Sequence, residues 1–319
     1  MRVLFMGTSD FAVPSLEELI RKKFDIVGVV TQPDRPSGRG RKLQTPPVKL
    51  VAEKNKLNVF QPERVRESST VNQLKRLGPD VVVVVAFGQI LPRSILDIPP
   101  SGCFNVHPSL LPKYRGAAPI QWALINGETE TGITIMLLDE GEDTGDIISQ
   151  RRIAIDQEAD AVVLHQQLGN LAPDLLIRTL RKSKDQLPVT QPQDGLQATY
   201  APQLTKGLGN INWHKSAVEI RNLVRGTAIW PQAYTYLQDN LRIKILSCSV
   251  MPPNSGATFS PGTLEISKDK QIVVHTTQGK LILNKVQPAT KNEMPAHDFV
   301  NGYRIETGDQ FISRLPSKK

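Results

Sequence analysis

Five consecutive valines constrain the fold of this chain more than any other feature. They lie within residues 80–87, which read DVVVVVAF and form one unbroken apolar run. Such a run is typical of a parallel β-strand that is buried on both faces of its sheet. Because parallel strands are joined by crossover helices, we expect the sequence around this run to alternate between strand and helix.

The first half of the chain has this alternation. Strand-like apolar runs occur at residues 3–6, 25–31, 80–87, 103–106 and 132–138, and helical spacing occurs at 11–22, 47–54, 117–125 and 161–182. Strands and helices in this order predict a doubly wound, Rossmann-like α/β sheet. We therefore expect an α/β domain over residues 1–184.

The composition changes near residue 184. Residues 185–207 contain three prolines and several glutamines with little apolar periodicity, which predicts an extended linker. Residues 208–319 then contain one expected helix and five short strand candidates, separated by short polar turns. The helix is expected at 216–225 and the strands at 233–238, 241–250, 262–266, 271–276 and 280–287. This pattern favours a small OB-like β-barrel, a fold that often binds nucleic acid.

Positive charge is concentrated in the C-terminal part. The chain carries a formal net charge of +8, and residues 206–319 hold 15 Lys and Arg against 8 Asp and Glu. This asymmetry indicates a polyanionic partner, such as a nucleic acid, held mainly by the C-terminal domain. An ordinary basic surface that keeps the protein soluble is the alternative, and charge alone does not decide between them.

Several classes of protein are excluded by what the sequence lacks. The two cysteines, Cys103 and Cys248, are far apart, so neither a zinc site nor a disulfide framework is expected, which suits a reducing cytoplasm. No run has the roughly 18 apolar residues of a membrane helix, and the N-terminus resembles neither a signal nor a transit peptide. Only Gly7 of a dinucleotide fingerprint is present, and there is no Walker A sequence.

Two polar side chains stand at the end of one expected strand. Asn105 and His107 are two residues apart, so their side chains point to the same side. They should lie at the carboxyl edge of the sheet, where α/β proteins bind their ligands. An amide donor beside an imidazole suits stabilisation of an oxyanion and proton transfer. A capped strand end with a hydrogen-bonded histidine is the alternative interpretation.

An acidic segment follows the next strand. Residues 139–146 read DEGEDTGD, and strands side by side should bring this loop to the same sheet edge as His107. A carboxylate there would orient His107 and favour its protonated form. The alternatives are a solvated acidic turn or a calcium loop, although the ligand spacing of an EF-hand is absent.

A basic segment lies between residues 32 and 49. Glycines interleave with its cations and make it pliable, and its only acidic neighbour in sequence is Asp34. This suits a mobile arm that contacts phosphates, and a solvated basic loop is the alternative. The cations concerned are Arg35, Arg39, Arg41 and Lys42.

These motifs together resemble the methionyl-tRNA formyltransferase family over essentially the whole chain. The run from Asn105 to Gly116 looks like the signature of enzymes that use 10-formyltetrahydrofolate, and Asp143 matches the family's catalytic aspartate. Other features narrow the resemblance to this family. They are Gly7-Thr8, Phe11, the basic loop at 33–43, residues 116–121, Tyr200-Ala201-Pro202 and the basic barrel.

The resemblance implies transfer of a formyl group from 10-formyltetrahydrofolate to the α-amino group of methionine on initiator tRNA. Asn105 and protonated His107 would stabilise the oxyanion, while Asp143 would orient His107 and help move the proton of the amine through water. The family needs no metal and no covalent enzyme intermediate. The folate would contact Phe87, Gly88, Gln89, Ile90, Leu91, Ser109, Leu110, Leu111 and Pro112.

Two other functions stay open at this point. One is a folate-dependent formyltransferase that acts on a small amine, such as a nucleotide sugar. The other is a non-enzymatic protein that binds folate and tRNA. The basic loop and the charged C-terminal domain argue against the small amine, and the complete Asn105, His107 and Asp143 set argues against the non-enzymatic binder. We expect a cytoplasmic monomer.

Overall fold

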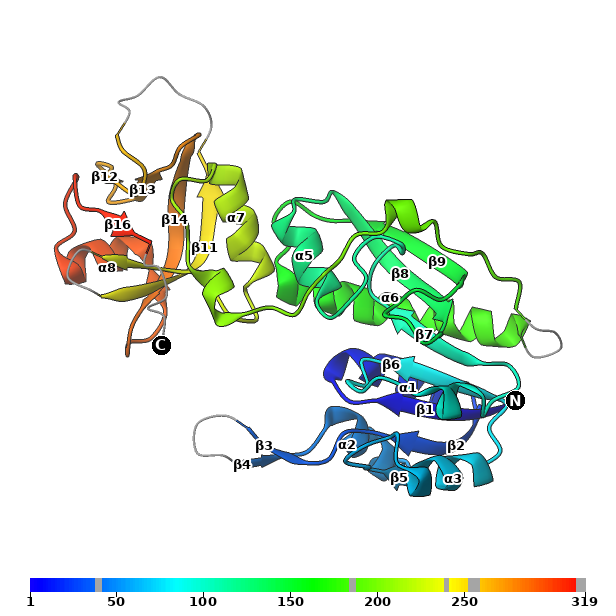
Figure 1. Ribbon diagram of the computed structural model, residues 1–319. Coiled ribbons are helices and arrows are strands. Elements are labelled where there is room, and N and C mark those ends of the chain that lie inside the picture. Colours follow the sequence, from blue (N-terminus) through cyan, green and yellow to red (C-terminus); the bar gives the residue numbers. More distant parts are fainter. Residues whose placement is uncertain (38–41, 184–187, 238–240, 252–258, 314–319) are drawn as a thin grey trace. The chain divides into compact units, whose positions relative to one another are not determined.

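The computed structural model describes residues 1–37, 42–183, 188–237, 241–251 and 259–313 (Figure 1). Contacts divide the chain into two compact units. The first contains Met1–Pro119, Glu130–Ala154 and His165–Ala201, and the second contains Ile120–Thr129, Ile155–Leu164 and Pro202–Lys319. Two short segments from the first half of the sequence thus group with the C-terminal part. The expected boundaries at 184 and 207 stay predictions.

A seven-stranded sheet forms the centre of the first unit, in the order β5-β2-β1-β6-β7-β8-β9. The five strands from β5 to β7 are parallel, which confirms the expected Rossmann-like sheet. β8 and β9 are antiparallel to their neighbours, a departure from the all-parallel expectation. The strands are β1 (Arg2–Gly7), β2 (Asp25–Val30), β5 (Val59–Phe60), β6 (Val81–Val85), β7 (Cys103–His107), β8 (Glu130–Leu137) and β9 (Ile147–Ala154).

The valine run is β6, and all five of its side chains are buried, as a central parallel strand requires. Helices connect the strands, beginning with the 3-10 turn η1 (Asp10–Ala12) and α1, which buries Leu16 and Leu19. The helices are α1 (Val13–Arg21), α2 (Pro47–Lys54), α3 (Ser68–Arg76), α4 (Arg93–Leu96), α5 (Pro119–Ile125) and α6 (Ala161–Lys182). The expected helices at 47–54 and 161–182 have the predicted bounds.

The basic segment after β2 is partly regular. Its described residues form the short antiparallel strands β3 (Arg35–Ser37) and β4 (Lys42–Gln44). Three cross-strand residue pairs join the two strands. The mobile arm stays a prediction. Arg39 and Arg41 lie outside the described residues.

The second unit contains an antiparallel sheet in the order β12-β13-β14-β11-β10-β16, with β15 beside β14. Backbone hydrogen bonds of 2.8 Å from Phe311 N to Gly262 O and from Leu264 N to Asp309 O join its two ends. The sheet therefore nearly closes on itself, which confirms the OB-like barrel. The strands are β10 (Tyr234–Leu237), β11 (Arg242–Val250), β12 (Leu264–Ile266), β13 (Ile272–His275), β14 (Lys280–Pro288), β15 (Met294–Pro295) and β16 (Phe311–Ile312).

Two of the described helices lie in the C-terminal part of the second unit, to which most of α5 also belongs. α7 (Ala217–Gly226) begins at a capping box, in which Ser216 and Glu219 bond to each other's backbone N–H groups. α8 (Ala296–Tyr303) buries Phe299 in the barrel core. The remaining regular elements are two 3-10 turns, η2 (Gly195–Gln197) and η3 (Lys206–Gly209).

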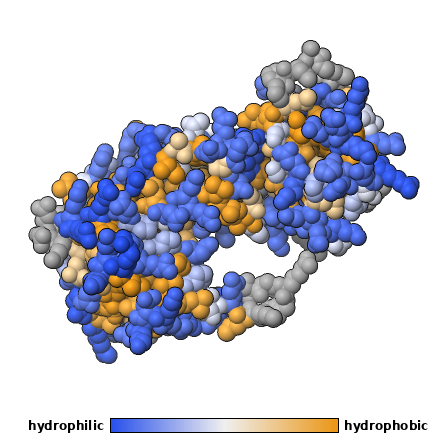
Figure 2. Space-filling model, turned by 180° about the vertical axis from the view of Figure 1, so that it is seen from behind, coloured by the Kyte–Doolittle hydropathy of each residue, from blue (hydrophilic) through white to orange (hydrophobic). Residues whose placement is uncertain are grey.

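Figure 2 shows that hydrophilic residues cover most of the face drawn there, and hydrophobic residues emerge between them in smaller areas. The apolar side chains named above are instead buried in the cores of the two units. Among the described residues, we find no helix with the length and apolar character needed to cross a membrane.

Candidate active site

The candidate site is built on the last residues of β7. Asn105 and His107 are two residues apart in this strand, so both side chains lie on one face of the sheet. β7 lies beside β6, and both strands end at the carboxyl edge of the parallel sheet. The His107 side chain is about 5% exposed, so its surroundings rather than solvent determine what its ring contacts.

Asp143 joins these two side chains through both of its carboxylate oxygens. Oδ1 lies 3.4 Å from Asn105 Nδ2, and Oδ2 lies 3.5 Å from His107 Nδ1. The backbone N–H of Gly116 donates to the same Oδ2 over 2.9 Å. The structure thus brings together all three side chains that the sequence singled out.

The route by which Asp143 reaches His107 differs from the expected one. β8 is antiparallel to β7, with Phe104 opposite Leu137, so the acidic loop leaves the sheet at the end where β7 begins. The expectation that the loop emerges at the same edge as His107 is therefore wrong. Because Asp143 nevertheless contacts Asn105 and His107, the loop must fold back over the sheet face that carries their side chains.

Both ring nitrogens of His107 face acceptors. Nε2 lies 2.8 Å from the carbonyl oxygen of Tyr114, which can only accept, so Nε2 must carry a proton. Nδ1 faces the carboxylate of Asp143. This arrangement suits an imidazole that carries a proton on each nitrogen.

Backbone conformation at the site is unusual. Tyr114 and Asp143 are non-glycine residues with φ of 62° and 53°, in the left-handed region that side chains other than Asn and Asp seldom adopt. Residues held in such conformations cluster at functional sites, where the surrounding contacts maintain them. Tyr114 supplies the carbonyl for His107, and Asp143 supplies the carboxylate.

A glutamine from the segment before the second unit maintains the Asp143 loop. Gln193 Nε2 donates to the carbonyl oxygens of Asp143 and Gly145 over 2.9 and 2.7 Å. Its Oε1 accepts two hydrogen bonds, of 3.0 and 2.8 Å, from the guanidinium of Arg115, which is 6% exposed. Sequence reasoning missed Gln193, because the proline- and glutamine-rich segment around it carries no local signal.

The segment from Ser109 to Pro112 is hydrogen-bonded to β8 and β9. The Thr134 hydroxyl accepts from Leu111 N over 3.1 Å and donates to Ser109 O over 2.7 Å. Gln150 Nε2 donates to Leu111 O over 2.8 Å. These bonds satisfy the backbone of a turn that is largely buried, so the wall beside His107 is held in one conformation.

The residues expected to contact folate fall into two groups. The side chains of the first group are buried; it comprises Phe87, Leu91, Ser109 and Leu111. Accessible residues comprise Gly88, Gln89, Ile90, Leu110 and Pro112. Contact between either group and folate stays a prediction.

The cations of the basic segment are less isolated than expected. Arg35 Nη2 lies 3.5 Å from Glu63 Oε2, an acidic residue from outside the basic segment. Asp34 is instead paired with Lys49 at 2.9 Å, and hydrogen bonds from Gln61 and Lys49 lower the pKa of its carboxyl group. The side chain of Lys42 is not among those described.

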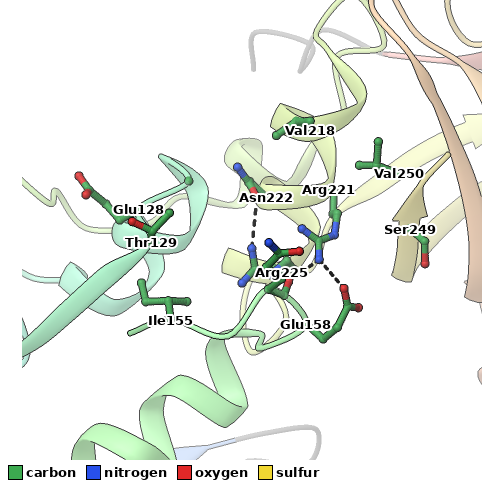
Figure 3. Close-up of a pocket in the computed structure, with 12 residues that line it drawn as sticks. Glu128, Thr129, Ile155, Glu158, Val218, Arg221, Asn222, Arg225, Ser249 and Val250 are labelled. Carbon is green, nitrogen blue, oxygen red and sulfur yellow. Dashed lines mark hydrogen bonds and ion pairs between the residues drawn. The ribbon is translucent and has the colours of Figure 1, made fainter. Parts of the chain in front are cut away.

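A cavity of about 450 Å³ in the second unit lies between α7 and the segment around Glu158 (Figure 3). The arginines that line it are already occupied. Arg225 donates to the carbonyl oxygens of Ala159 and Asp156, over 2.7 and 2.9 Å, and Arg221 pairs with Glu158 at 2.7 Å. These contacts fasten α7 to the segment around Glu158.

The described residues contain no group of three or more His, Cys, Asp or Glu side chains arranged to hold a metal. The candidate site consists of an amide, an imidazole and one carboxylate that meet near a sheet edge. Such a set can donate hydrogen bonds to a developing oxyanion and accept a proton from an attacking nucleophile.

Comparison with known proteins identifies the family. A family model described as formyl transferase matches residues 1–180, and a second, described as the C-terminal domain of formyl transferase, matches residues 203–304. The methionyl-tRNA formyltransferase of Acetivibrio thermocellus is 46% identical over 310 residues, which is 97% of this chain and 99% of the relative. That of Thermodesulfovibrio yellowstonii is 47% identical over 96% of this chain and 97% of its own length.

This chain belongs to the methionyl-tRNA formyltransferase family. The resemblance drawn from the motifs is thereby confirmed, and members of this family are formyl transferases. More distant proteins of known structure have the same fold as this chain. WlaRD, a sugar 3N-formyl transferase, superposes with a TM-score of 0.67 at 20% identity, over 92% of this chain and 99% of its own. HypX from Aquifex aeolicus, solved with tetrahydrofolic acid, superposes with a TM-score of 0.61 at 14% identity, over 98% of this chain and 51% of its own.

Proposed function

We propose that the chain transfers the formyl group of 10-formyltetrahydrofolate to the α-amino group of L-methionyl-initiator tRNA. The product would be N-formylmethionyl-tRNA for translation initiation. One structural observation carries the chemical part of this proposal: Asn105 and His107 lie within 3.5 Å of one carboxylate, that of Asp143. The relatives named methionyl-tRNA formyltransferase support the choice of substrate, because they match this chain over nearly its full length.

The first step is attack of the neutral amine on the formyl carbon. A C–N bond forms, and the carbonyl oxygen becomes an oxyanion. Asn105 Nδ2 and His107 Nδ1 border the same carboxylate, so the formyl oxygen would lie beside these two donors. A donor placed in this way contributes about 3–4 kcal/mol to stabilisation of the transition state in other acyl transfers.

The second step is proton transfer and collapse of the intermediate. Before this step the negative charge of Asp143 keeps His107 oriented; Asp143 would then accept the proton that the amine loses, directly or through water. The bond between the formyl carbon and N10 then breaks, N10 takes a proton, and tetrahydrofolate leaves. The 3.5 Å separation of His107 Nδ1 and Asp143 Oδ2 is long for a hydrogen bond, which suits a contact that tightens when substrate binds.

The accessible residues near the site fit a folate cosubstrate. Ile90 is 90% exposed and offers an apolar side chain beside the exposed backbone of Gly88. The turn from Ser109 to Pro112 would form the opposite wall. The tRNA would be held by the basic segment and by the C-terminal unit, through the phosphate contacts that Lys and Arg make. We place this activity in the cytoplasm, where initiator tRNA is used, and expect a monomer to carry it out.

A competition between acceptors tests the proposal. The protein is incubated with 10-formyltetrahydrofolate and methionyl-initiator tRNA, methionyl-elongator tRNA or an amino nucleotide sugar, and formylated products are quantified. We expect formylation of the initiator tRNA and much slower formylation of the elongator. Formylation of the sugar alone would refute the proposal, and so would the absence of any formyl transfer.

A further inference from the structure

The segment predicted to be a linker is hydrogen-bonded to the loop that carries Asp143. Gln191 and Ile147 exchange two backbone hydrogen bonds of 2.8 Å. Beside them, Thr190 Oγ1 donates to Asp146 Oδ2 over 2.8 Å. A simple spacer would need no such bonds, so this part of the segment fixes one end of the loop.

Further along, the same segment is bonded to the residues that follow His107 in sequence. Thr199 O accepts from Arg115 N over 2.9 Å, and Ala201 N donates to Arg115 O over 2.7 Å. The carbonyl oxygen of Ala201 comes so close to Gly116 that a Cβ atom there would lie 3.0 Å from it. Gly116 also has φ of +111°, so this position favours glycine on both counts. The segment therefore packs directly on the backbone beside the candidate site.

One side chain of the segment reaches the residue that holds His107. Thr199 Oγ1 accepts a hydrogen bond of 2.9 Å from the backbone N–H of Tyr114. The carbonyl oxygen of Tyr114 in turn accepts from His107 Nε2 over 2.8 Å. Two hydrogen bonds, one on each side of Tyr114, thus connect the Thr199 hydroxyl to the imidazole.

The conformation of Tyr114 makes this contact important. Its φ of 62° lies in the left-handed region, which is sterically unfavourable for a tyrosine. A residue in this region keeps its conformation only while the surrounding contacts hold it there. The bond from Tyr114 N to Thr199 is one of these contacts. If it is lost, the backbone at Tyr114 can relax, and the carbonyl that faces His107 moves with it.

We propose that Thr199 is a positioning residue for formyl transfer, because its hydroxyl holds Tyr114 in the conformation that orients the His107 ring. This inference rests on the proposed function, since it takes His107 to act on the oxyanion. Thr199 itself need not touch either substrate. A neutral hydrogen bond changes an equilibrium by about three- to tenfold, so its loss should lower the transfer rate by about this factor. Substrate affinities should stay within about twofold of normal.

Single-turnover formylation of methionyl-initiator tRNA tests the proposal with matched variants. Thr199→Val has nearly the same shape without the hydroxyl and should lower the rate about three- to tenfold. Thr199→Ser keeps the hydroxyl and should give a rate within about twofold of normal. The control is Thr205→Val, which should change nothing. Thr205 is exposed in the same segment, and its hydroxyl bonds to none of the described residues.

A comparison of double variants shows whether Thr199 acts through His107. In a His107→Ala background, Thr199→Val should lower the remaining rate by less than about twofold, because the ring that it positions is gone. A full further reduction in that background would overturn the inference. A normal rate in Thr199→Val would do the same, and so would a Thr199→Ser variant as slow as Thr199→Val.

The ring proton of His107 provides a readout that does not depend on activity. NMR of protein with ¹⁵N-labelled histidine follows exchange of the Nε2 proton with water, and the signal is assigned by its absence in His107→Ala. We expect faster exchange in Thr199→Val than in the unmodified protein or in Thr205→Val. Faster exchange without any formyl transfer would support the contact and refute the proposed function. Formyl transfer with an unchanged rate and unchanged exchange in Thr199→Val would refute only the inference.

Discussion

Asp143 Oδ2 lies 3.5 Å from His107 Nδ1, although the strand before Asp143 runs antiparallel to the strand that ends in His107. The acidic loop must therefore cross the sheet face to reach the imidazole. A loop in this position needs support from outside the sheet. Gln193 provides it through the carbonyl oxygens of Asp143 and Gly145, and Arg115 in turn holds Gln193.

Replacing Gln193 should impair catalysis without touching either substrate. Gln193→Leu leaves two carbonyl oxygens and the guanidinium of Arg115 without their partner, at a cost of about 1–3 kcal/mol for each buried unsatisfied group. We expect the Asp143 loop to relax and kcat to fall about tenfold or more, with KM values within twofold of normal. Steady-state kinetics measures this.

Gln197→Leu is the matched control, because among the described residues the exposed Gln197 bonds only to nearby Asp194. Gln193→Glu separates a positioning role from simple loss of packing, since it keeps the acceptor for Arg115 but cannot donate to the loop. It should lower kcat and alter the pH–rate profile, whereas Gln197→Leu should change neither. A Gln193→Leu variant with normal kcat would show that the loop holds Asp143 without this contact.

Cations of the C-terminal unit should contribute to tRNA affinity according to whether they are already paired. Lys244 and Lys291 make no side-chain ion pair with any residue that the structure describes, whereas Lys285 is paired with Glu293 at 3.1 Å. We expect Lys244→Gln and Lys291→Gln each to weaken tRNA binding about two- to fivefold and to lower the salt dependence of log Kd by about one unit. Titrations at several salt concentrations measure both effects.

Lys285→Gln serves as the control and should change tRNA affinity less than either of the other substitutions. Charge removed from a phosphate contact must reduce the number of counterions that binding releases. Unchanged salt dependence in both Lys244→Gln and Lys291→Gln would therefore place the tRNA contacts elsewhere.

The two thiols should be inert in the folded protein. Burial raises the pKa of Cys103 and of Cys248 to about 12, from an ordinary value of 9.0. The thiolate is the reactive form, so at pH 8 its population should be about a thousandfold lower than in the unfolded chain. Native protein should not react with a disulfide reagent on the timescale on which denatured protein reacts at both sites.

The raised pKa values of the two thiols also predict how the stability of the protein changes with pH. A raised pKa means that the unfolded chain loses these protons first. The contribution to stability is therefore complete below pH 9 and is lost as the pH rises from 9 towards 12. Cys103 is in β7 and Cys248 in β11, so Cys103→Ala and Cys248→Ala variants report separately on opening of the two units. Rapid labelling of either thiol at pH 8 in native protein would contradict its burial.

Local patterns in the sequence predict much of the fold. The bounds of α2 and α6 follow from helical spacing, and β6 follows from the valine run. β9 was not predicted, because it is an edge strand whose segment IISQRRIA is largely exposed and carries two arginines instead of an apolar run. The pairing direction of β8 was also missed, because strand direction depends on contacts far apart in the sequence.

The candidate site, like the fold, is predicted by the sequence only in part. The strand period places Asn105 and His107 on one face, so the sequence predicts their proximity. The family resemblance identified Asp143, but the assumption of a parallel β8 gave it the wrong route to His107. Gln193 is more distant still, 50 residues after Asp143 in sequence. Its partners are backbone carbonyl oxygens, which carry no residue-specific signal.

The most direct test of the proposed mechanism is the single-turnover rate of formyl transfer to methionyl-initiator tRNA for Asp143→Asn, measured beside the Kd for that tRNA. Asparagine has nearly the same shape but can neither accept the proton of the amine nor face His107 with a negative charge. General acid–base groups contribute about 10²–10⁴-fold to rate, so we predict a fall of at least about a hundredfold, with the tRNA Kd within twofold of normal. A rate within a few-fold of the unmodified protein would contradict the role of Asp143 and, with it, the mechanism.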